Sequence, residues 1–308
     1  MLNGHMDTVG VVGMKEPFVG KFRDGRVYGR GAFDMKGAIA AMLLATKSIK
    51  ESCTRLRGDL ILTTVVDEEY ASTGTEQVVK EYKADAALLL EATDLKIGVA
   101  HKGFAWIEVE TSGKAAHGSR ADLGVDAIVS MGRLLVELAE LDKRIRTGKK
   151  HPLLGTGSVH ASLIQGGREL STYLDRCTMQ LERRTLPGET KETVSKEIQS
   201  IIDKLRSNDD RFEATFRVTF FRDAWEADEN SQVVAGVNGC IRNRTGRPSE
   251  KTVQSGWLDS SILQKAGIPC AIFGSGGSDA HGVNECVDLG QVVECANILV
   301  DIIKTFCG

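Results

Sequence analysis

The sequence lacks any apolar run long enough to cross a membrane. Its longest apolar stretches, such as AALLLEA at residues 86–92, fall far short of the roughly 20 residues that a spanning helix needs. Its first residues also lack the basic and apolar segments of a secretory signal peptide. We therefore expect a soluble, cytoplasmic protein with no membrane partner.

The sequence also lacks an excess of charge and any C-x-x-C spacing. The formal net charge is −3 and no basic face dominates, so nucleic acid is not an expected partner. The seven cysteines are an odd number and are scattered, which favours free thiols in a reducing compartment over a disulfide framework. Apolar residues at 42% and charged residues at 26% are typical of an ordinary globular protein.

The sequence does contain an alternation of strand and helix patterns. Residues 57–69 (RGDLILTTVVDEE) and 84–94 (ADAALLLEATD) are apolar runs that end in acids, and residues 34–51 (DMKGAIAAMLLATKSIKE) predict a helix. Near-continuous apolar strands that alternate with helices predict an α/β fold, with a parallel-rich sheet covered by helices.

A different pattern begins near residue 102. Alternating segments at 103–113, 157–167, 175–186 and 211–222 read as strands, and 124–143 and 189–207 read as amphipathic helices. Their order, β-α-β-β-α-β, is that of a ferredoxin-like α+β unit.

The first pattern then returns, with a buried strand and Gly-rich loop at 265–277 and a closing helix at 290–306. A chain of 308 residues has room for two domains, because single cores rarely grow past about 250–300 residues. We therefore predict a discontinuous α/β domain at 1–101 and 223–308, with an α+β domain inserted at 102–222.

Acidic and histidine residues follow the strand patterns of the expected α/β domain. They are His5, Asp7, Asp34, Glu68, Glu69, Glu91 and His281. Ligand sites collect at the carboxyl ends of strands in open parallel sheets. Each residue alone is more often an ordinary surface or core residue, but the ordered set makes coincidence improbable. Two histidines with several carboxylates suit two Zn²⁺ ions, with Co²⁺ or Mn²⁺ as alternatives, and a shared aspartate can hold two metals close enough to activate one water.

Seven short motifs occur in one order: GHMDTV, GRGAFDMKG, DEE, HKG, GKAAHGS, ERRTLPGE and AHGVNE. With this ordered set, nearly the whole chain resembles the zinc peptidase and deacylase family of aminoacylase, acetylornithine deacetylase, succinyl-diaminopimelate desuccinylase and glutamate carboxypeptidase. The resemblance implies that His5 and Glu91 bind one zinc ion, that Glu69 and His281 bind the second, and that Asp34 bridges both. It also implies a cis peptide bond between Asp34 and Met35.

The resemblance assigns catalytic roles as well. Glu68 would be the general base, and Asp7 would hold the imidazole of His5, since residues two apart in a strand face the same side. The resemblance makes 1–101 and 223–308 the metal-binding catalytic domain and 102–222 an inserted dimerisation or lid domain. His117 would come from this inserted domain, reach across a homodimer and donate to the oxyanion.

Substrate-binding roles follow from the same resemblance. Arg184 would bind the substrate carboxylate through its guanidinium fork, and the loop around Gly276 could add backbone N–H donors. We expect the neighbouring Arg183 to be a solvated strand residue. Ser171 and Leu174 stand where the family usually has Asn and Pro; Ser171 can still donate a hydrogen bond, but substrate specificity cannot be copied from Asn-containing relatives.

The opening stretch is a second departure. Family members carry a longer segment before the His-x-Asp motif, whereas only Met1 and Leu2 precede Asn3-Gly4 here. We therefore expect the strand that bears His5 to be nearly absent, and the first ten residues to be ordered mainly by the metal.

The predicted function is that of a dinuclear-zinc hydrolase that cleaves the amide bond of an N-acyl amino acid, working as a homodimer. A carboxypeptidase or dipeptidase of the same family remains an alternative. A third alternative, from another class, is a non-catalytic truncated paralogue that only dimerises or binds a ligand.

Overall fold

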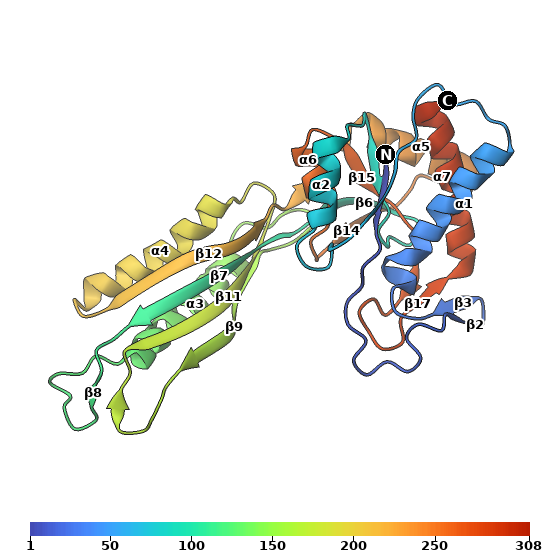
Figure 1. Cartoon of the computed structure of the whole chain (residues 1–308). Coiled ribbons are helices and arrows are strands. Elements are labelled where there is room, and N and C mark those ends of the chain that lie inside the picture. The colour runs from blue at the N-terminus through green and yellow to red at the C-terminus, as the bar shows by residue number, and fades with distance from the viewer. The chain divides into compact units, whose positions relative to one another are not determined.

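The computed structural model describes residues 1–308, and the chain folds as two compact units (Figure 1). The first unit comprises Met1–Ala100, Glu226–Val253 and Leu258–Gly308. The second unit comprises His101–Trp225 and Gln254–Trp257. The second unit is therefore inserted into the sequence of the first.

A mixed sheet forms the centre of the first unit. Its strands run in the order β13-β6-β15-β5-β1-β4, with β14 also paired to β6. The bounds are β1 Leu2–His5, β4 Leu62–Val65, β5 Ala87–Leu89, β6 Ile97–His101, β13 Trp225–Glu226, β14 Lys251–Gln254 and β15 Cys270–Ile272. Strands β1, β4, β5 and β15 are parallel to their neighbours in this set, so their carboxyl ends lie at the same edge.

Strand β1 is an interior strand of the sheet, paired on both sides. The expectation that it is nearly absent is wrong. It pairs with β4 on one side, from Leu2 opposite Leu62 to His5 opposite Val65, and with β5 on the other. All four of its residues are buried. Because both edges of the strand find partners, four residues suffice to fix the backbone that carries His5.

Helices pack in two groups against this sheet (Figure 1). One group contains α1 Gly37–Glu51, α5 Gln232–Thr245 and α7 Leu289–Cys307; the other contains α2 Thr73–Glu81 and α6 Ser260–Lys265. In α7 the buried residues include Val292, Cys295, Ala296 and Leu299, a helical spacing that places one apolar stripe against the core. No helix combines the length and the apolar character that a membrane span requires.

A small antiparallel sheet and a π-helical turn complete the first unit. The sheet has the order β16-β17-β3-β2, and its strands are β16 Gly277–Ser278, β17 Cys286–Asp288, β3 Arg26–Tyr28 and β2 Lys21–Arg23. The turn η1 spans Ala32–Lys36 and leads into α1. Within it the peptide bond between Asp34 and Met35 is cis, which confirms the prediction from the resemblance.

The second unit has the predicted element order. A four-stranded antiparallel sheet, β12-β7-β11-β9, is built from β7 Gly103–Ser112, β9 Ser158–Gly166, β11 Arg176–Thr185 and β12 Glu213–Arg222. Its helices are α3 Ala127–Thr147 and α4 Lys191–Asn208, and a short ribbon pairs β8 Ala116–His117 with β10 Thr172–Tyr173. Alternate residues of β7 and β11 are buried, and they form one core with apolar residues of both helices.

The segment Gln254–Trp257 belongs to the second unit, although the expected boundaries leave it in the first. The indole of Trp257 donates a hydrogen bond to the carbonyl of Asp223 at 3.0 Å, and its ring lies edge-on to Phe104. These long-range contacts decide the assignment, and no local sequence pattern marks them.

Candidate metal centre

Five segments of the first unit converge on one group of side chains. The contributing residues are His5 at the end of β1, Asp34 in η1, Glu68 and Glu69 after β4, Glu91 after β5, and His281 in the loop from β16 to β17. Three of these segments follow parallel neighbouring strands, so their side chains meet at one edge of the sheet.

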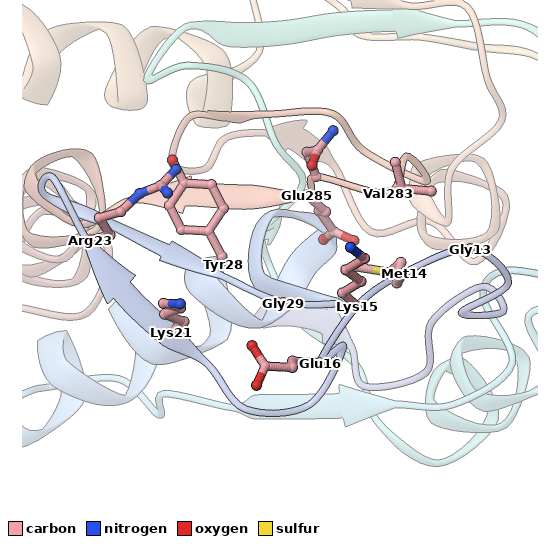
Figure 2. Close-up of a pocket in the computed structure, with 11 residues that line it drawn as sticks. Gly13, Met14, Lys15, Glu16, Lys21, Arg23, Tyr28, Gly29, Val283 and Glu285 are labelled. Atoms are coloured by element: carbon pink, nitrogen blue, oxygen red, sulfur yellow. The ribbon is translucent and has the colours of Figure 1, made fainter.

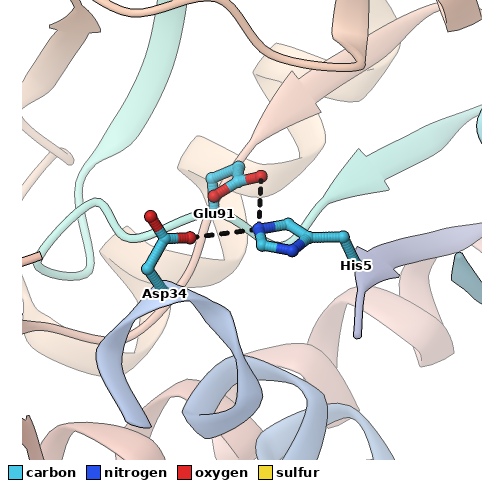
Figure 3. Close-up of side chains that lie close together, drawn as sticks. All are labelled: His5, Asp34 and Glu91. Atoms are coloured by element: carbon cyan, nitrogen blue, oxygen red, sulfur yellow. Dashed lines mark hydrogen bonds and ion pairs between the residues drawn. The ribbon is translucent and has the colours of Figure 1, made fainter. Parts of the chain in front are cut away.

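His5, Asp34 and Glu91 form the first group of potential ligands, with ligand atoms within 4.8 Å of one another (Figure 3). The Nε2 atom of His5 lies 3.0 Å from Oδ1 of Asp34 and 3.8 Å from Oε1 of Glu91. Ligands about 2 Å from a tetrahedral zinc ion lie roughly 3–4 Å from each other. The spacing therefore matches that of three ligands around one zinc ion.

Asp34, Glu69 and His281 form a second group with the same spacing limit. The Nε2 atom of His281 lies 3.1 Å from Oδ2 of Asp34 and 3.2 Å from Oε2 of Glu69. Asp34 therefore offers Oδ1 to the first group and Oδ2 to the second. A carboxylate with this arrangement can serve two cations at once.

The chemistry of the donor set fits divalent cations. Buried oxygens of Asp7, Glu68, Glu69 and Glu91 have no hydrogen-bond partner. A buried acceptor without a partner costs about 1–3 kcal/mol, and more if it is charged. A cation would satisfy the oxygens of the ligand carboxylates and offset the charge of several acids gathered in one place.

Electrostatic interactions shift the pKa values of this cluster in opposite directions. Burial raises the pKa of Glu91 to about 8, and burial with the charges of Glu91 and Asp259 raises that of Glu68 well above its usual range. Burial would lower the pKa of His5, but the hydrogen bond to Asp34 and nearby carboxylates raise it to about 11. The protein without metal therefore holds protons that a cation would displace.

Asp34 is the acid that stays ionised in this cluster. Burial would raise its pKa, but hydrogen bonds from His281 and His5 outweigh burial and hold the pKa well below its usual range. The same hydrogen bond raises the pKa of His281. Asp34 thus keeps both oxygens available as acceptors at neutral pH.

Asp7 contacts two of the segments that carry ligands. Its Oδ2 accepts a hydrogen bond from the backbone N–H of Glu69 at 3.1 Å. The Nδ1 atom of His5 lies 3.1 Å from the backbone oxygen of Asp7 and 3.6 Å from its carboxylate. The carbonyl is therefore the nearer partner of the imidazole, where the sequence led us to expect the carboxylate.

Glu68 faces the same cluster without belonging to either group of ligands. Its side chain is buried, and its Oε2 lies 4.0 Å from Nε2 of His5. Gly276 was predicted as a source of backbone donors. It is buried and directly precedes β16, and its carbonyl accepts the N–H of Asp288. A Cβ atom at position 276 would overlap the Asp94 carboxylate, so close packing explains this glycine.

The other predicted site residues lie in the second unit. His117 is exposed, with Nδ1 2.9 Å from the hydroxyl of Ser119, and it stands opposite Thr172 in the β8–β10 ribbon. The carbonyl of Ser171 accepts the N–H of Gly118 at 2.7 Å. The fold thus places His117 and Ser171 side by side, far apart though they are in sequence.

Arg184 and Arg183 point to opposite faces of β11. Arg184 is half-buried; its Nε donates to Glu182 at 2.6 Å and its guanidinium lies over the ring of Phe104. Arg183 is 1% exposed and forms ion pairs with Glu189 and Glu197 at 2.8 and 3.0 Å. The expectation that Arg183 is solvated is wrong, because two half-buried acids, Glu189 just before α4 and Glu197 within it, pair with its buried guanidinium.

Sequence reasoning missed Arg30 and Glu285, which form a buried ion pair beside Asp34 and His281. Both residues lie within motifs of the ordered set. Arg30 stands between the first two glycines of GRGAFDMKG, and Glu285 ends AHGVNE, four residues after His281. A charged residue next to ligand residues was the only available signal.

Comparisons with known proteins agree with the fold and with the resemblance. A model of Peptidase family M20/M25/M40 matches residues 1–305. An N-formyl-4-amino-5-aminomethyl-2-methylpyrimidine deformylase of Bacillus subtilis is 31% identical, over 100% of this chain and 79% of its own length. An acetylornithine deacetylase of Myxococcus xanthus is 30% identical, over 93% of this chain and 74% of its own.

Solved structures share the fold. A tripeptidase from Staphylococcus aureus aligns with a TM-score of 0.78 and 24% identity, over 99% of this chain and 80% of that one. A dinuclear metal-binding peptidase of the M20 family from Bacillus subtilis aligns with a TM-score of 0.76 and 14% identity, over 99% and 80%. The chain belongs to Peptidase family M20/M25/M40 and is a hydrolase of the metal-dependent amidohydrolase and peptidase type.

Proposed function

We propose that this enzyme is a dinuclear-zinc deacylase that cleaves the amide bond of an N-acyl amino acid. The observation that carries the proposal is the position of Asp34, whose two oxygens face two separate His-carboxylate groups. His5 and Glu91 would hold one zinc ion, Glu69 and His281 the other, and Asp34 both. When bound, the two ions would polarise the scissile carbonyl and make a water molecule acidic at neutral pH.

Glu68 is the proposed general base. Its carboxylate would accept a proton from the attacking water and pass it to the nitrogen of the leaving amine. Burial raises the pKa of Glu68 above its usual range, which makes its carboxylate a stronger base for this task. Asp7 would position His5 and Glu69 through the contacts described above.

Residues of the second unit are proposed to bind substrate. His117 would donate an N–H to the oxyanion that forms during amide cleavage, and Arg184 would pair with the substrate carboxylate. Ser171, next to His117, would add a hydrogen bond, and backbone groups around Gly276 would contribute from the first unit. We therefore propose the first unit as the catalytic domain and the second as the lid and dimerisation domain.

A face of the second unit supports a homodimer. Strand β9 is an edge strand of its sheet, and Leu163 and Ile164 on it are 64% and 55% exposed. Val129 and Val136, seven residues apart on α3, are also exposed, and α3 packs beside β9. Exposed edges and apolar patches are normally covered, and a second copy of this unit could cover both.

Deacylase activity is preferred over the alternatives for two reasons. A deformylase and a deacetylase are among the relatives that reach 30% identity, whereas the peptidases named above resemble this chain in fold. A carboxypeptidase or dipeptidase activity remains the second candidate, because the metal centre would serve either substrate. A non-catalytic role is disfavoured, since every residue of both ligand groups and Glu68 is in place.

The test is a substrate panel with the zinc-loaded protein. N-formyl, N-acetyl and N-succinyl amino acids are compared with dipeptides by their kcat/KM values, and bound zinc is counted in the same sample. We expect two zinc ions per chain and the highest kcat/KM on an N-acyl amino acid. Preference for dipeptides would support the second candidate, and no turnover of any of these compounds with full zinc loading would overturn both proposed substrate classes.

A further inference from the structure

Arg30 and Glu285 form a buried ion pair that lies just outside the ligand groups. The Nη1 atom of Arg30 is 2.5 Å from Oε2 of Glu285, and their side chains are 3% and 0% exposed. Removing either partner would leave a buried charge without a counterion, so the pair is expected to be fixed in place.

The carboxylate of Glu285 also binds the backbone of the turn that carries Asp34. Its Oε2 accepts the N–H of Gly31 at 3.1 Å, and its Oε1 accepts those of Phe33 and Asp34 at 3.0 and 3.1 Å. One carboxylate thus receives three backbone donors in addition to the guanidinium. These bonds fix the position of the Asp34 backbone directly.

The guanidinium of Arg30 binds two further segments. Its Nη2 donates to the carbonyl of His281 at 3.2 Å, and its Nε donates to the carbonyl of Gly10 at 3.1 Å. The backbone of His281 has a φ of 63°, in the left-handed region that residues other than glycine rarely adopt. The bond to its carbonyl stabilises this conformation and so helps to aim the imidazole.

Packing alone cannot hold the segment that carries His281. Residues 278–284 are exposed or half-buried throughout, so they bury no apolar side chain. A cavity of about 480 Å³ is lined by Val283 and Glu285 and by polar residues such as Lys15, Lys21 and Arg23 (Figure 2). Within the segment the N–H groups of Gly282 and Asn284 donate to Asp279, and the buried pair at Glu285 joins the segment to the turn that carries Asp34.

We propose that Arg30 and Glu285 are positioning residues that set the distance between Asp34 and His281, and thereby tune the second metal site. The inference rests on the dinuclear centre proposed above. It predicts an effect on the site formed by Asp34, Glu69 and His281, with a smaller effect on the site formed by His5 and Glu91.

Two substitutions test the proposal. Glu285→Gln keeps the size of the side chain, but its amide places an NH₂ group against one pair of N–H donors. Arg30→Lys keeps the charge, but a single ammonium cannot replace a fork that contacts Glu285, His281 and Gly10 at once. The matched control is Glu197→Gln, which removes a half-buried acid that pairs with the buried Arg183 in the second unit.

Zinc affinity of the two equivalents is measured by titration of metal-free protein against a chelating competitor. We expect both variants to bind the second equivalent about 10–100-fold more weakly, as is typical when partners of metal ligands are lost. The first equivalent should weaken much less, and Glu197→Gln should bind both as the wild type does. Hydrogen exchange at the amides of residues 31–34 should rise in metal-free Glu285→Gln and not in the control.

The second site is identified by combining Arg30→Lys with Glu69→Ala. If Glu69→Ala already lacks the second equivalent, adding Arg30→Lys should cause little further loss of zinc affinity. Two outcomes would overturn the inference: wild-type affinity for both equivalents in folded Glu285→Gln and Arg30→Lys, or equal weakening of both equivalents. A wild-type protein that binds fewer than two zinc ions would instead overturn the dinuclear centre itself, and the role of the pair with it.

Discussion

Asp34 and His281 are 247 residues apart in sequence, yet Nε2 of His281 lies 3.1 Å from Oδ2 of Asp34. The other oxygen of the same carboxylate lies 3.0 Å from Nε2 of His5. One side chain therefore connects two potential metal sites, and a change at Asp34 should affect both, whereas a change at Glu69 or Glu91 should affect one.

The first prediction separates catalysis from metal binding at the adjacent residues Glu68 and Glu69. Glu68→Gln should keep both zinc ions and lose about 10²–10⁴-fold in kcat, the usual contribution of a general base. Glu69→Ala should lose one zinc ion, because Glu69 faces His281 and Asp34 in the second group. Zinc counts and kcat are measured on the same samples. Equal loss of zinc from both variants would contradict the role assigned to Glu68.

The second prediction concerns pH and the metal-free protein. Burial raises the pKa of Glu91 to about 8, whereas the unfolded chain releases this proton near its ordinary value of about 4.3. The folded state then binds more protons than the unfolded state, so the contribution of Glu91 to stability is full below about pH 4.3 and is lost as the pH rises through 8. The change in His5, whose pKa rises to about 11, has the same sign.

Glu91→Gln isolates this contribution. The free energy of unfolding of the metal-free protein, measured by urea titration between pH 5 and pH 8, should fall less steeply with pH in the variant than in the wild type. Zinc should reverse the trend in the wild type, because binding displaces protons and tightens as the pH rises. Parallel pH profiles for the two metal-free proteins would show that Glu91 does not hold the extra proton.

The third prediction replaces the expectation that the first ten residues are ordered mainly by the metal. Strand β1 pairs on both sides and is buried, so the amides of residues 2–5 should be protected from hydrogen exchange with and without zinc. Residues 7–9 lie beyond the strand and should gain protection only with zinc, because metal binding by His5 and Glu69 would fix the two segments that the Asp7 carboxylate joins. Exchange by mass spectrometry on both states measures this. Rapid exchange at residues 2–5 without zinc would restore the original expectation.

Sequence patterns predicted much of this centre because of one geometric rule. His5 and Glu91 follow neighbouring parallel strands, and such strands end at a common edge, so an acid after each apolar run was enough to bring them together. The ferredoxin-like unit followed equally from the order of alternating and helical patterns. Local periodicity carries this information, and it needs no knowledge of long-range contacts.

Three features depended on contacts that no local pattern records. Period-two alternation places Arg183 and Arg184 on opposite faces, but only the acids of α4 reveal which face is buried. Strand β1 is too short for its own pattern to identify it, because its neighbours supply its pairing. Glu285 could not be linked to Arg30, since 255 residues separate them and neither has a periodic context.

The last prediction tests whether the proposed homodimer shares its active sites. If His117 of each chain serves the metal centre of its partner, a His117→Ala homodimer and a Glu68→Ala homodimer should both be nearly inactive. A heterodimer of the two variants would contain one centre with an intact Glu68 served by an intact His117. Activity should then rise on mixing toward about a quarter of the wild-type value, since random exchange of subunits makes half of the dimers mixed and each mixed dimer has one working site of two.

Mixing His117→Ala with itself after the same exchange treatment is the control, and native mass spectrometry of differently tagged chains measures the mixed fraction. No rise in activity despite confirmed exchange would show that each chain uses its own His117, and an active His117→Ala homodimer would show that His117 plays no part in catalysis. A Val136→Glu variant that remains dimeric would separately contradict the proposed α3–β9 interface.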